Sequence, residues 1–388
     1  MTEYSQSRGG GGEVLDGGFA RVLETSLAAW SLYGEMDAWR RAWGRALDAV
    51  GLGPQETPGR VVLARPPVTL KAYHRPAEGG PAVLLVPAPF KRAYLWDLAP
   101  RASVVRRCLE AGFRVYLLQW EPPGEAEAEY GLAQYAGRLL LEALEAVAAD
   151  GGAARPGLIA HSLGGTFAAA FTAAHPERVG ALALLAAPLH FGEGIGAFGR
   201  TLAALSRTGL PERLPGNVPG SYLNTLSVLA SPKTFQLDRW LDWLSSMGDA
   251  EAAQTHLRVE RWALDETPLP RKLFAEIAAW LYREDRFMRG TLELGGRRAA
   301  PERLAIPVLC AADPRCDIVP PQSVVPFYEA LPGANKALLW YHGDTGVAIQ
   351  HVGLLVGRNA HRRLWPEILR WLSGALAHDG SGKRGQQG

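Results

Sequence analysis

The feature that most constrains the fold is the ten-residue run GLIAHSLGGT at residues 157–166. Its apolar start is typical of a strand, and the alanine-rich segment after it is typical of a helix. Small residues flank Ser162, with Ala160 before it and Gly164 and Gly165 after it, so the backbone can turn sharply without side-chain collision. The run therefore predicts a strand, a tight turn that presents the Ser162 hydroxyl, and a helix. The alternative is that Ser162 only caps a helix.

Apolar runs and helical patterns alternate along the rest of the chain. Strands are expected at residues 61–63, 68–73, 82–87, 114–119, 158–160, 181–185, 306–311 and 337–341, and helices at 103–111, 132–149, 166–175 and 362–375. The first two strands are expected to form an antiparallel pair. The others alternate with helices, which predicts a mostly parallel sheet with helices on both faces.

The same patterns divide the chain into segments. We expect a flexible leader at 1–15, an N-terminal helical segment at 16–54, the first part of an α/β core at 55–191, a helical cap at 192–298, the second part of the core at 299–376 and a flexible tail at 377–388. The cap is expected because the alternation stops there, and an insertion of this kind commonly covers an active site. In the N-terminal segment, the apolar stripe that includes Trp39 and Trp43 is expected to pack into the core rather than bind a partner.

Composition excludes several classes of protein. The 388 residues carry a formal net charge of +2 and no basic patch interleaved with aromatic residues, so nucleic-acid binding is not expected. No apolar run reaches 18 residues, so no transmembrane segment is expected. The three cysteines lack metal-site spacing, and the polar, glycine-rich N-terminus lacks a secretion signal. We therefore expect a cytoplasmic protein with no metal and no cofactor.

A serine hydroxyl becomes a useful nucleophile only when a base takes its proton. In α/β-hydrolases the serine, the acid and the histidine follow one another in that order along the chain. His351 lies after the last predicted strand and is predicted as the base. The alternatives are that His342 is the base, or that His351 has only a structural or surface role. His161, next to the serine, is expected to pack rather than to transfer protons. Together with the strand pattern, this order predicts an α/β-hydrolase fold with a helical cap.

The position expected for the acid holds a cysteine. In these folds the acid commonly occurs as Asp-x-x-Val-Pro, and counting back from Val319-Pro320 leads to Cys316. A thiol orients a histidine poorly unless it is ionised. We predict Asp317 as the acid, with Asp313 as the alternative, and an acid from another strand end, or none, stays open.

An oxyanion hole requires two backbone N–H groups that point at the developing charge. Leu163, directly after the nucleophile, is predicted to supply one of them. The other is expected from the loop after residues 82–86, where prolines lack an N–H and leave Ala88 or Phe90. We predict Phe90; the alternative is that this loop only turns the chain.

These residues resemble the polyhydroxyalkanoate synthase family over about residues 60–373. The similarity is carried by VPAPFKRAYLWDL at 86–98, QWEPP at 119–123, YGLAQY at 130–135, RVERW at 258–262 with Asp265, FMRG at 287–290 continuing through LGG at 294–296, and QHVG at 350–353. The resemblance supports His351 and Phe90 in the predicted roles. It also implies hydroxyacyl-CoA as a possible substrate, a polyester as a possible ligand and the ability to form a homodimer. The chain departs from the family by having Ser162 for the nucleophilic cysteine and Cys316 for the acid.

An oxygen ester on Ser162 would be less activated than the thioester that a cysteine forms, and its usual fate in a hydrolase is attack by water. We therefore expect a serine esterase, thioesterase or acyltransferase of synthase ancestry that works through a Ser-ester acyl-enzyme. Two alternatives stay open. One is a synthase that polymerises (R)-3-hydroxyacyl-CoA, and the other is a non-catalytic α/β-hydrolase-fold protein that binds polymer or partners.

Overall fold

The computed structural model describes residues 30–73, 79–151, 154–192 and 194–381. The leader expected at 1–15 lies outside these residues, as does the first part of the N-terminal apolar stripe. At the other end, the last helix extends to Ser381, which is past the expected start of the tail at residue 377.

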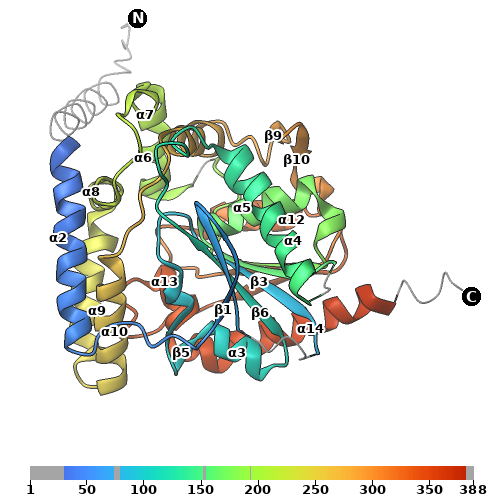
Figure 1. The fold of residues 1–388 in the computed structure, drawn as a ribbon, viewed down its shortest axis with the longest axis horizontal. Coiled ribbons are helices and arrows are strands. Elements are labelled where there is room, and N and C mark those ends of the chain that lie inside the picture. Colours follow the sequence, from blue (N-terminus) through green and yellow to red (C-terminus); the bar gives the residue numbers. More distant parts are fainter. Residues whose placement is uncertain (1–29, 74–78, 152–153, 193, 382–388) are drawn as a thin grey trace, which may run out of the picture.

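A mostly parallel eight-stranded sheet forms the centre of the described chain (Figure 1). Its strand order is β1-β2-β6-β3-β7-β8-β11-β12. The strands are β1 (Arg60–Arg65), β2 (Val68–Ala72), β3 (Ala82–Val86), β6 (Arg114–Trp120), β7 (Gly157–His161), β8 (Ala181–Leu185), β11 (Val308–Ala312) and β12 (Lys336–Trp340). The pairs β1–β2 and β2–β6 are antiparallel, and the pairs from β6 to β12 are parallel. The sheet confirms the predicted α/β class and the antiparallel opening pair.

Helices cover both faces of this sheet, as predicted. The helices of the described chain are α2 (Trp30–Ala49), α3 (Val104–Glu110), α4 (Leu139–Gly151), α5 (Leu163–Ala174), α6 (Gly196–Arg207), α7 (Leu210–Arg213), α8 (Gly220–Ala230), α9 (Asp238–Ser246), α10 (Ala250–Ala263), α11 (Arg271–Glu276), α12 (Val325–Ala330), α13 (Gln350–Val356) and α14 (Trp365–Ser381). Helices α4 and α5 lie on one face, and α3 and α14 lie on the other (Figure 1).

Strand β3 shows why the sheet needs both layers of helices. All five of its residues are buried. Because successive side chains of a strand point to opposite faces, Leu84 and Val86 join the apolar cluster under α4 and α5, whereas Val83 and Leu85 join the cluster under α3 and α14. Burial of each such side chain stabilises the fold by roughly 1.5–3 kcal/mol. A strand that is apolar at every position is therefore best placed in the middle of the sheet, where helices cover both of its faces.

Helices α6 to α11 form an insertion between β8 and β11, which we call the helical insertion (residues 196–283). Its helices agree with the expectation for most of residues 192–298. The end of that range differs, because residues 292–299 form a β-hairpin, β9 (Leu292–Leu294) and β10 (Arg297–Ala299), rather than a helix. In Figure 1, α8, α9 and α10 lie beside the N-terminal helix α2.

The prediction that Trp39 and Trp43 pack into the core is wrong. Their side chains are 66% and 52% exposed, and their rings stack on each other at the surface. Helix α2 instead buries Tyr33, Asp37 and Gly44. Asp37 accepts hydrogen bonds from the first turn of α8, so a polar anchor decides which face of α2 is turned inward.

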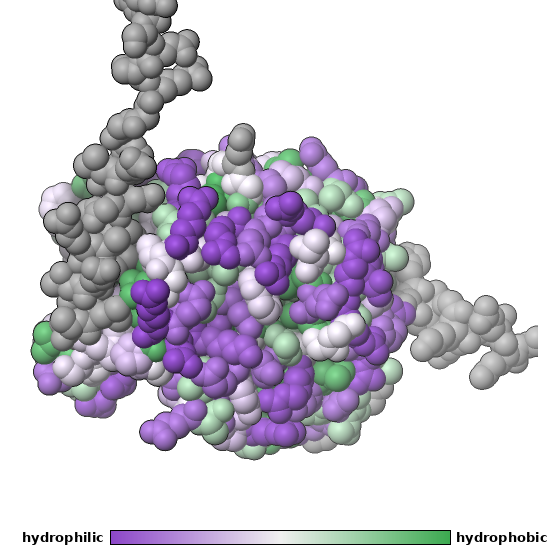
Figure 2. Space-filling view, turned by 90° about the horizontal axis from the view of Figure 1, so that it is seen from above, coloured by the Kyte–Doolittle hydropathy of each residue, from purple (hydrophilic) through white to green (hydrophobic). Residues whose placement is uncertain are grey.

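The outer surface agrees with the composition. Hydrophilic side chains predominate on the face seen in Figure 2, with hydrophobic residues scattered among them. In the part of the chain that the structure describes, no helix combines the length and the apolar character needed to span a membrane.

Candidate active site

Ser162 lies at a sharp turn between β7 and α5, as the sequence predicts. Its φ of 55° and ψ of −136° are unusual for a residue with a side chain. Such a conformation costs about 1–3 kcal/mol and persists only where the surroundings enforce it. Here the Ser162 N–H donates to the carbonyl of Leu185 in the neighbouring strand β8, at 3.0 Å. The turn therefore fixes the hydroxyl at the carboxyl end of the sheet.

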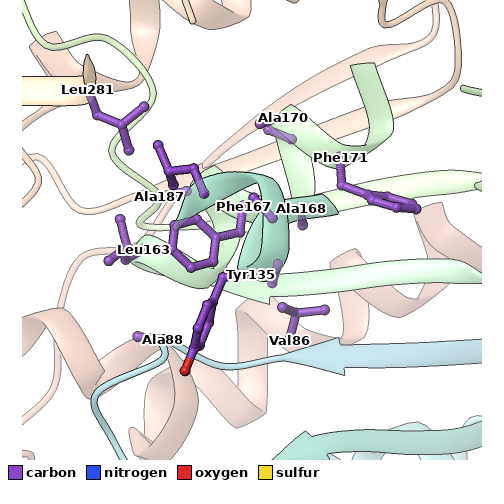
Figure 3. Packing of buried hydrophobic residues seen from close by; sticks show 14 of the residues in the cluster. Val86, Ala88, Tyr135, Leu163, Phe167, Ala168, Ala170, Phe171, Ala187 and Leu281 are labelled. Carbon is purple, nitrogen blue, oxygen red and sulfur yellow. The ribbon is translucent and has the colours of Figure 1, made fainter. Parts of the chain in front are cut away.

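The two glycines after Ser162 are needed for close approach. A Cβ on Gly164 would overlap the carbonyl oxygen of Pro87, and a Cβ on Gly165 would overlap the side chain of Ala187. Helix α5 thus begins directly against the loop that follows β3. In Figure 3, Leu163 and Phe167 of α5 lie close to Tyr135, in the buried cluster that supports this turn.

His351, the second residue of α13, lies within hydrogen-bond distance of Ser162. Its Nε2 is 2.9 Å from the Ser162 Oγ, which is the geometry of a base that accepts the hydroxyl proton. For Nε2 to accept, the neutral ring must carry its proton on Nδ1. Burial, with a smaller contribution from His161, holds the pKa of His351 well below its usual value. The imidazole is therefore neutral and able to accept a proton at neutral pH.

Cys316 lies on the other side of the same imidazole. Its Sγ is 3.6 Å from the His351 Nδ1 and accepts a hydrogen bond from the Val319 N–H at 3.3 Å. Burial raises the pKa of the Cys316 thiol to about 11, so the thiol is neutral at physiological pH. A neutral thiol is a weak acceptor and carries no charge to stabilise an imidazolium. Counting along the sequence located this position correctly.

The structure does not bring Asp317 to His351. The Asp317 side chain is 58% exposed, and its Oδ2 lies 3.5 Å from the Thr234 hydroxyl and 3.6 Å from the Lys233 ammonium. Because Cys316 and Asp317 are adjacent, only one of them can turn toward the histidine, and the cysteine does. Asp317 therefore does not occupy the predicted place of the acid in this structure.

The alternative acid, Asp313, is buried at the end of β11. Its Oδ1 accepts from the Arg315 N–H at 2.8 Å, and its Oδ2 has no hydrogen-bond partner within the described residues. Burial raises the pKa of this carboxyl. The structure shows no contact between Asp313 and His351, so the Nδ1 of His351 faces the Cys316 thiol.

His161 packs beside the base and also holds it. The two imidazole rings are 4.7 Å apart, and the His161 Nε2 lies 3.0 Å from the His351 carbonyl oxygen. Since a carbonyl only accepts, this Nε2 must be the donor. Burial lowers the pKa of His161 to about 4, which keeps the ring neutral. The sequence predicted the packing but not this hydrogen bond. The alternative base His342 lines a second cavity, whose wall also includes Cys316 and His351.

The two predicted oxyanion donors line the same cavity as Ser162 and His351. Leu163 is the first residue of α5, so its N–H has no carbonyl one turn earlier in the helix. Residues of the helical insertion bind the backbone around Phe90. The Thr267 N–H donates to the Phe90 carbonyl at 3.0 Å, and the Trp262 Nε1 donates to the Arg92 carbonyl at 2.9 Å. The helical insertion thus holds this loop at two points.

The cavity at Ser162 has a volume of about 150 Å³ and is lined mostly by apolar side chains from the core and the insertion. A cavity of roughly this size holds a molecule such as benzene. Lys91 adds a charged group to its wall, and the Lys91 Nζ lies 2.7 Å from the Glu266 Oε1. This ion pair could not be predicted from the sequence, because its two residues are far apart in the chain. No cluster of His, Cys, Asp or Glu in the described residues could hold a metal ion.

Comparison with known proteins agrees with this geometry. A family model described as alpha/beta hydrolase fold matches residues 81–210. The chain is 26% identical over 344 residues to the poly(3-hydroxyalkanoate) polymerase subunit PhaC of Haloarcula marismortui, covering 84% of this chain and 69% of that protein. The chain therefore has the α/β-hydrolase fold, and over most of its length it is similar in sequence to poly(3-hydroxyalkanoate) polymerase subunits.

A second synthase relative shows the same breadth of similarity. The PhaC subunit of Haloferax mediterranei is 26% identical over 363 residues, which cover 91% of this chain and 71% of that protein. Among solved structures, the monoacylglycerol lipase of Paleococcus ferrophilus superposes with a TM-score of 0.52 and 16% identity, over 79% of this chain and 99% of the lipase. At that identity the lipase supports the fold alone. These polymerase relatives favour the polymerising alternative over the hydrolase that we first expected from Ser162.

Proposed function

We propose that the chain is an acyltransferase that takes (R)-3-hydroxyacyl groups from CoA thioesters and passes them to a hydroxyl group through an ester on Ser162. The observation that carries this proposal is the 2.9 Å contact between Ser162 Oγ and His351 Nε2 inside an apolar cavity. The names of the relatives support the substrate class and the acceptor.

The proposed reaction has two steps. Ser162 Oγ attacks the thioester carbonyl while His351 takes its proton, and the N–H groups of Leu163 and Phe90 stabilise the oxyanion. The C–S bond then breaks, and the CoA thiolate takes the proton from His351. In the second step a hydroxyl group attacks the Ser162 ester, again with His351 as the base. The new ester leaves, and Ser162 regains its proton.

Hydrolysis is the second candidate, and Ser162 itself favours it. An oxygen ester reacts with a hydroxyl group less readily than a thioester does, so water competes better at Ser162 than at a cysteine. The apolar lining of the cavity acts in the opposite direction, because it offers few polar groups to hold an attacking water. The two candidates share the nucleophile and the base and differ only in the acceptor.

The products from (R)-3-hydroxybutyryl-CoA distinguish the candidates. We expect release of CoA and formation of polyester by the wild type, no activity in Ser162→Ala, and normal activity in the control Ser373→Ala, whose serine is exposed on α14. Free 3-hydroxybutyrate without polymer would instead support the hydrolase. No CoA release, together with no labelling of Ser162 by a fluorophosphonate, would support a non-catalytic binding protein.

A further inference from the structure

Helix α9 of the insertion reaches the loop that leads to the catalytic histidine. The Asp242 Oδ1 accepts a hydrogen bond from the Gly346 N–H at 2.9 Å, and its Oδ2 accepts one from the Ala348 N–H at 2.8 Å. These donors belong to the irregular segment at 341–349, between β12 and α13. One carboxylate from the insertion thus holds two backbone groups just before His351.

The Asp242 carboxylate is itself held in place. The His256 Nδ1 on α10 lies 2.8 Å from its Oδ2, and the side chains of Asp242 and His256 are only 9% and 4% exposed. Burial of a carboxylate costs free energy unless hydrogen bonds compensate for the lost water, and Asp242 has several such partners. Hydrogen bonds to a charged acceptor are also stronger than neutral ones. Asp242 is therefore a firm anchor between α9, α10 and the loop.

The loop needs such an anchor because its backbone is irregular. Gly346 has a φ of +80° and Ala348 a φ of +59°, and the latter conformation is unfavourable for a residue with a side chain. A Cβ on Gly346 would overlap the carbonyl oxygen of Ala252 on α10, so the loop lies tightly against the insertion. Helix α13 begins at Gln350, two residues after Ala348. The position of His351 therefore depends on where the insertion holds this loop.

We propose that Asp242 is the positioning residue for the catalytic base, and that the insertion completes the active site only when Asp242 is bound to this loop. In most serine hydrolases a carboxylate orients the histidine directly through Nδ1. Here Nδ1 faces only a thiol at 3.6 Å, so orientation must come from the backbone that carries the ring. Asp242 supplies a carboxylate that acts through that backbone. This inference rests on the proposed role of His351 as the base.

The rate at which a fluorophosphonate labels Ser162 tests the proposal without assuming an acceptor. Asp242→Asn keeps the shape but loses the charge and one of the two good acceptors. We expect labelling, and kcat with hydroxybutyryl-CoA, to fall roughly 100-fold with little change in KM, because small misplacements of catalytic groups have effects of this size. Asp238→Asn on the same helix, where the carboxylate binds the exposed Lys233, is the matched control and should keep the wild-type rate.

A second background separates positioning from general damage to the fold. Cys316→Asp would give His351 a direct carboxylate partner, so Asp242→Asn should then cost less than about tenfold instead of roughly 100-fold. An equal loss in both backgrounds, or no loss in either, would overturn the proposal.

Amide hydrogen exchange gives a readout that holds even if Ser162 proves unreactive. In Asp242→Asn we expect the amides of Gly346 and Ala348 to exchange at least about tenfold faster, with β7 and α5 unchanged, because local exchange follows local opening. Unchanged exchange in the loop would refute the anchor itself. Failure of the wild type to label, with faster exchange in the variant, would refute the proposed function and leave the anchor supported.

Discussion

At Cys316, a thiol lies where a carboxylate would orient and charge-stabilise the base. We predict that Cys316→Asp increases the rate of Ser162 labelling, and kcat with hydroxybutyryl-CoA, between about tenfold and about 1000-fold. Loss of the negative charge at this position costs roughly 10⁴-fold in a Ser-His-Asp enzyme, so its gain should be visible here. An aspartate at the other buried cysteine, Cys310→Asp, cannot serve as the control. It would bury a charge inside β11, away from the histidine, and is expected to unfold the protein. Cys316→Ser, a neutral change at the same position, is the appropriate control and should raise the rate little. A rate for Cys316→Asp at or below that of Cys316→Ser would contradict the prediction.

The same residues predict the pH dependence. His351 must be neutral to accept the proton of Ser162, and burial holds its pKa well below the ordinary value of about 6.5. The neutral form therefore persists as pH falls, and activity should be lost only at pH values below the ordinary histidine range. In Cys316→Asp the carboxylate favours the imidazolium and raises the pKa of His351, so the acidic limb should move to higher pH. The labelling rate measured between pH 4 and pH 8 checks both statements, and a wild-type limb above pH 6.5 would contradict the first.

Several of these residues could be predicted from the sequence, and others could not. Ser162 was found from its small neighbours, and His351 from the order of groups along the chain. We predicted Asp317 because it is a carboxylate, although the spacing along the sequence pointed to Cys316. In the structure Cys316, and not Asp317, lies beside His351. Asp242 and Lys91 gave no signal, because their partners come from segments that only tertiary packing brings together.

At the level of elements, the start of α5 is a tightly packed junction of the site. We predict that Gly164→Ala destabilises the protein by about 1–3 kcal/mol or more, since its Cβ would overlap the Pro87 carbonyl oxygen, which cannot move freely. The same substitution at Gly34, inside α2 with open space around it, should stabilise by up to about 1 kcal/mol. Urea unfolding followed by circular dichroism measures both changes. A Gly164→Ala variant as stable as the wild type would mean that α5 and the loop after β3 are not in close contact.

The strands and helices of the core follow from the sequence because each is a local pattern. The run at β3 is apolar at every position, and both layers of helices were expected from the alternation. The hairpin at 292–299 was missed because its strands are short and pair only with each other, at Arg297 with Leu294 and at Ala299 with Leu292. The insertion that precedes the hairpin is helical, so its turn was not predicted from the sequence. That turn depends on Gly295 and Gly296, which both have positive φ.

At the scale of the whole molecule, α2 joins the insertion through polar contacts rather than through its tryptophans. Asp37 accepts from the Ser221 N–H and hydroxyl at 2.7 and 2.6 Å, and from the Gly220 N–H at 3.2 Å. Arg40 binds Glu266, the partner of Lys91 in the cavity wall. Helix α2, the insertion and the oxyanion loop are therefore connected through these polar contacts, so their loss should destabilise the protein.

This connection predicts that substitutions of two residues of α2, two positions apart, have very different effects on the free energy of unfolding. Asp37→Ala leaves buried donors at the start of α8 without a partner, and we expect a loss of about 2–4 kcal/mol in the free energy of unfolding. Trp39→Ala removes a larger side chain that is 66% exposed, and we expect a change within about 0.5 kcal/mol. Urea unfolding by circular dichroism compares them, since fluorescence would change with the tryptophan itself. If Trp39→Ala costs as much as Asp37→Ala, an apolar contact holds α2 in place and the polar anchor does not. If only Asp37→Ala costs stability, the exposed Trp39 side chain contributes little to the fold, which is the opposite of what its spacing in the sequence suggested.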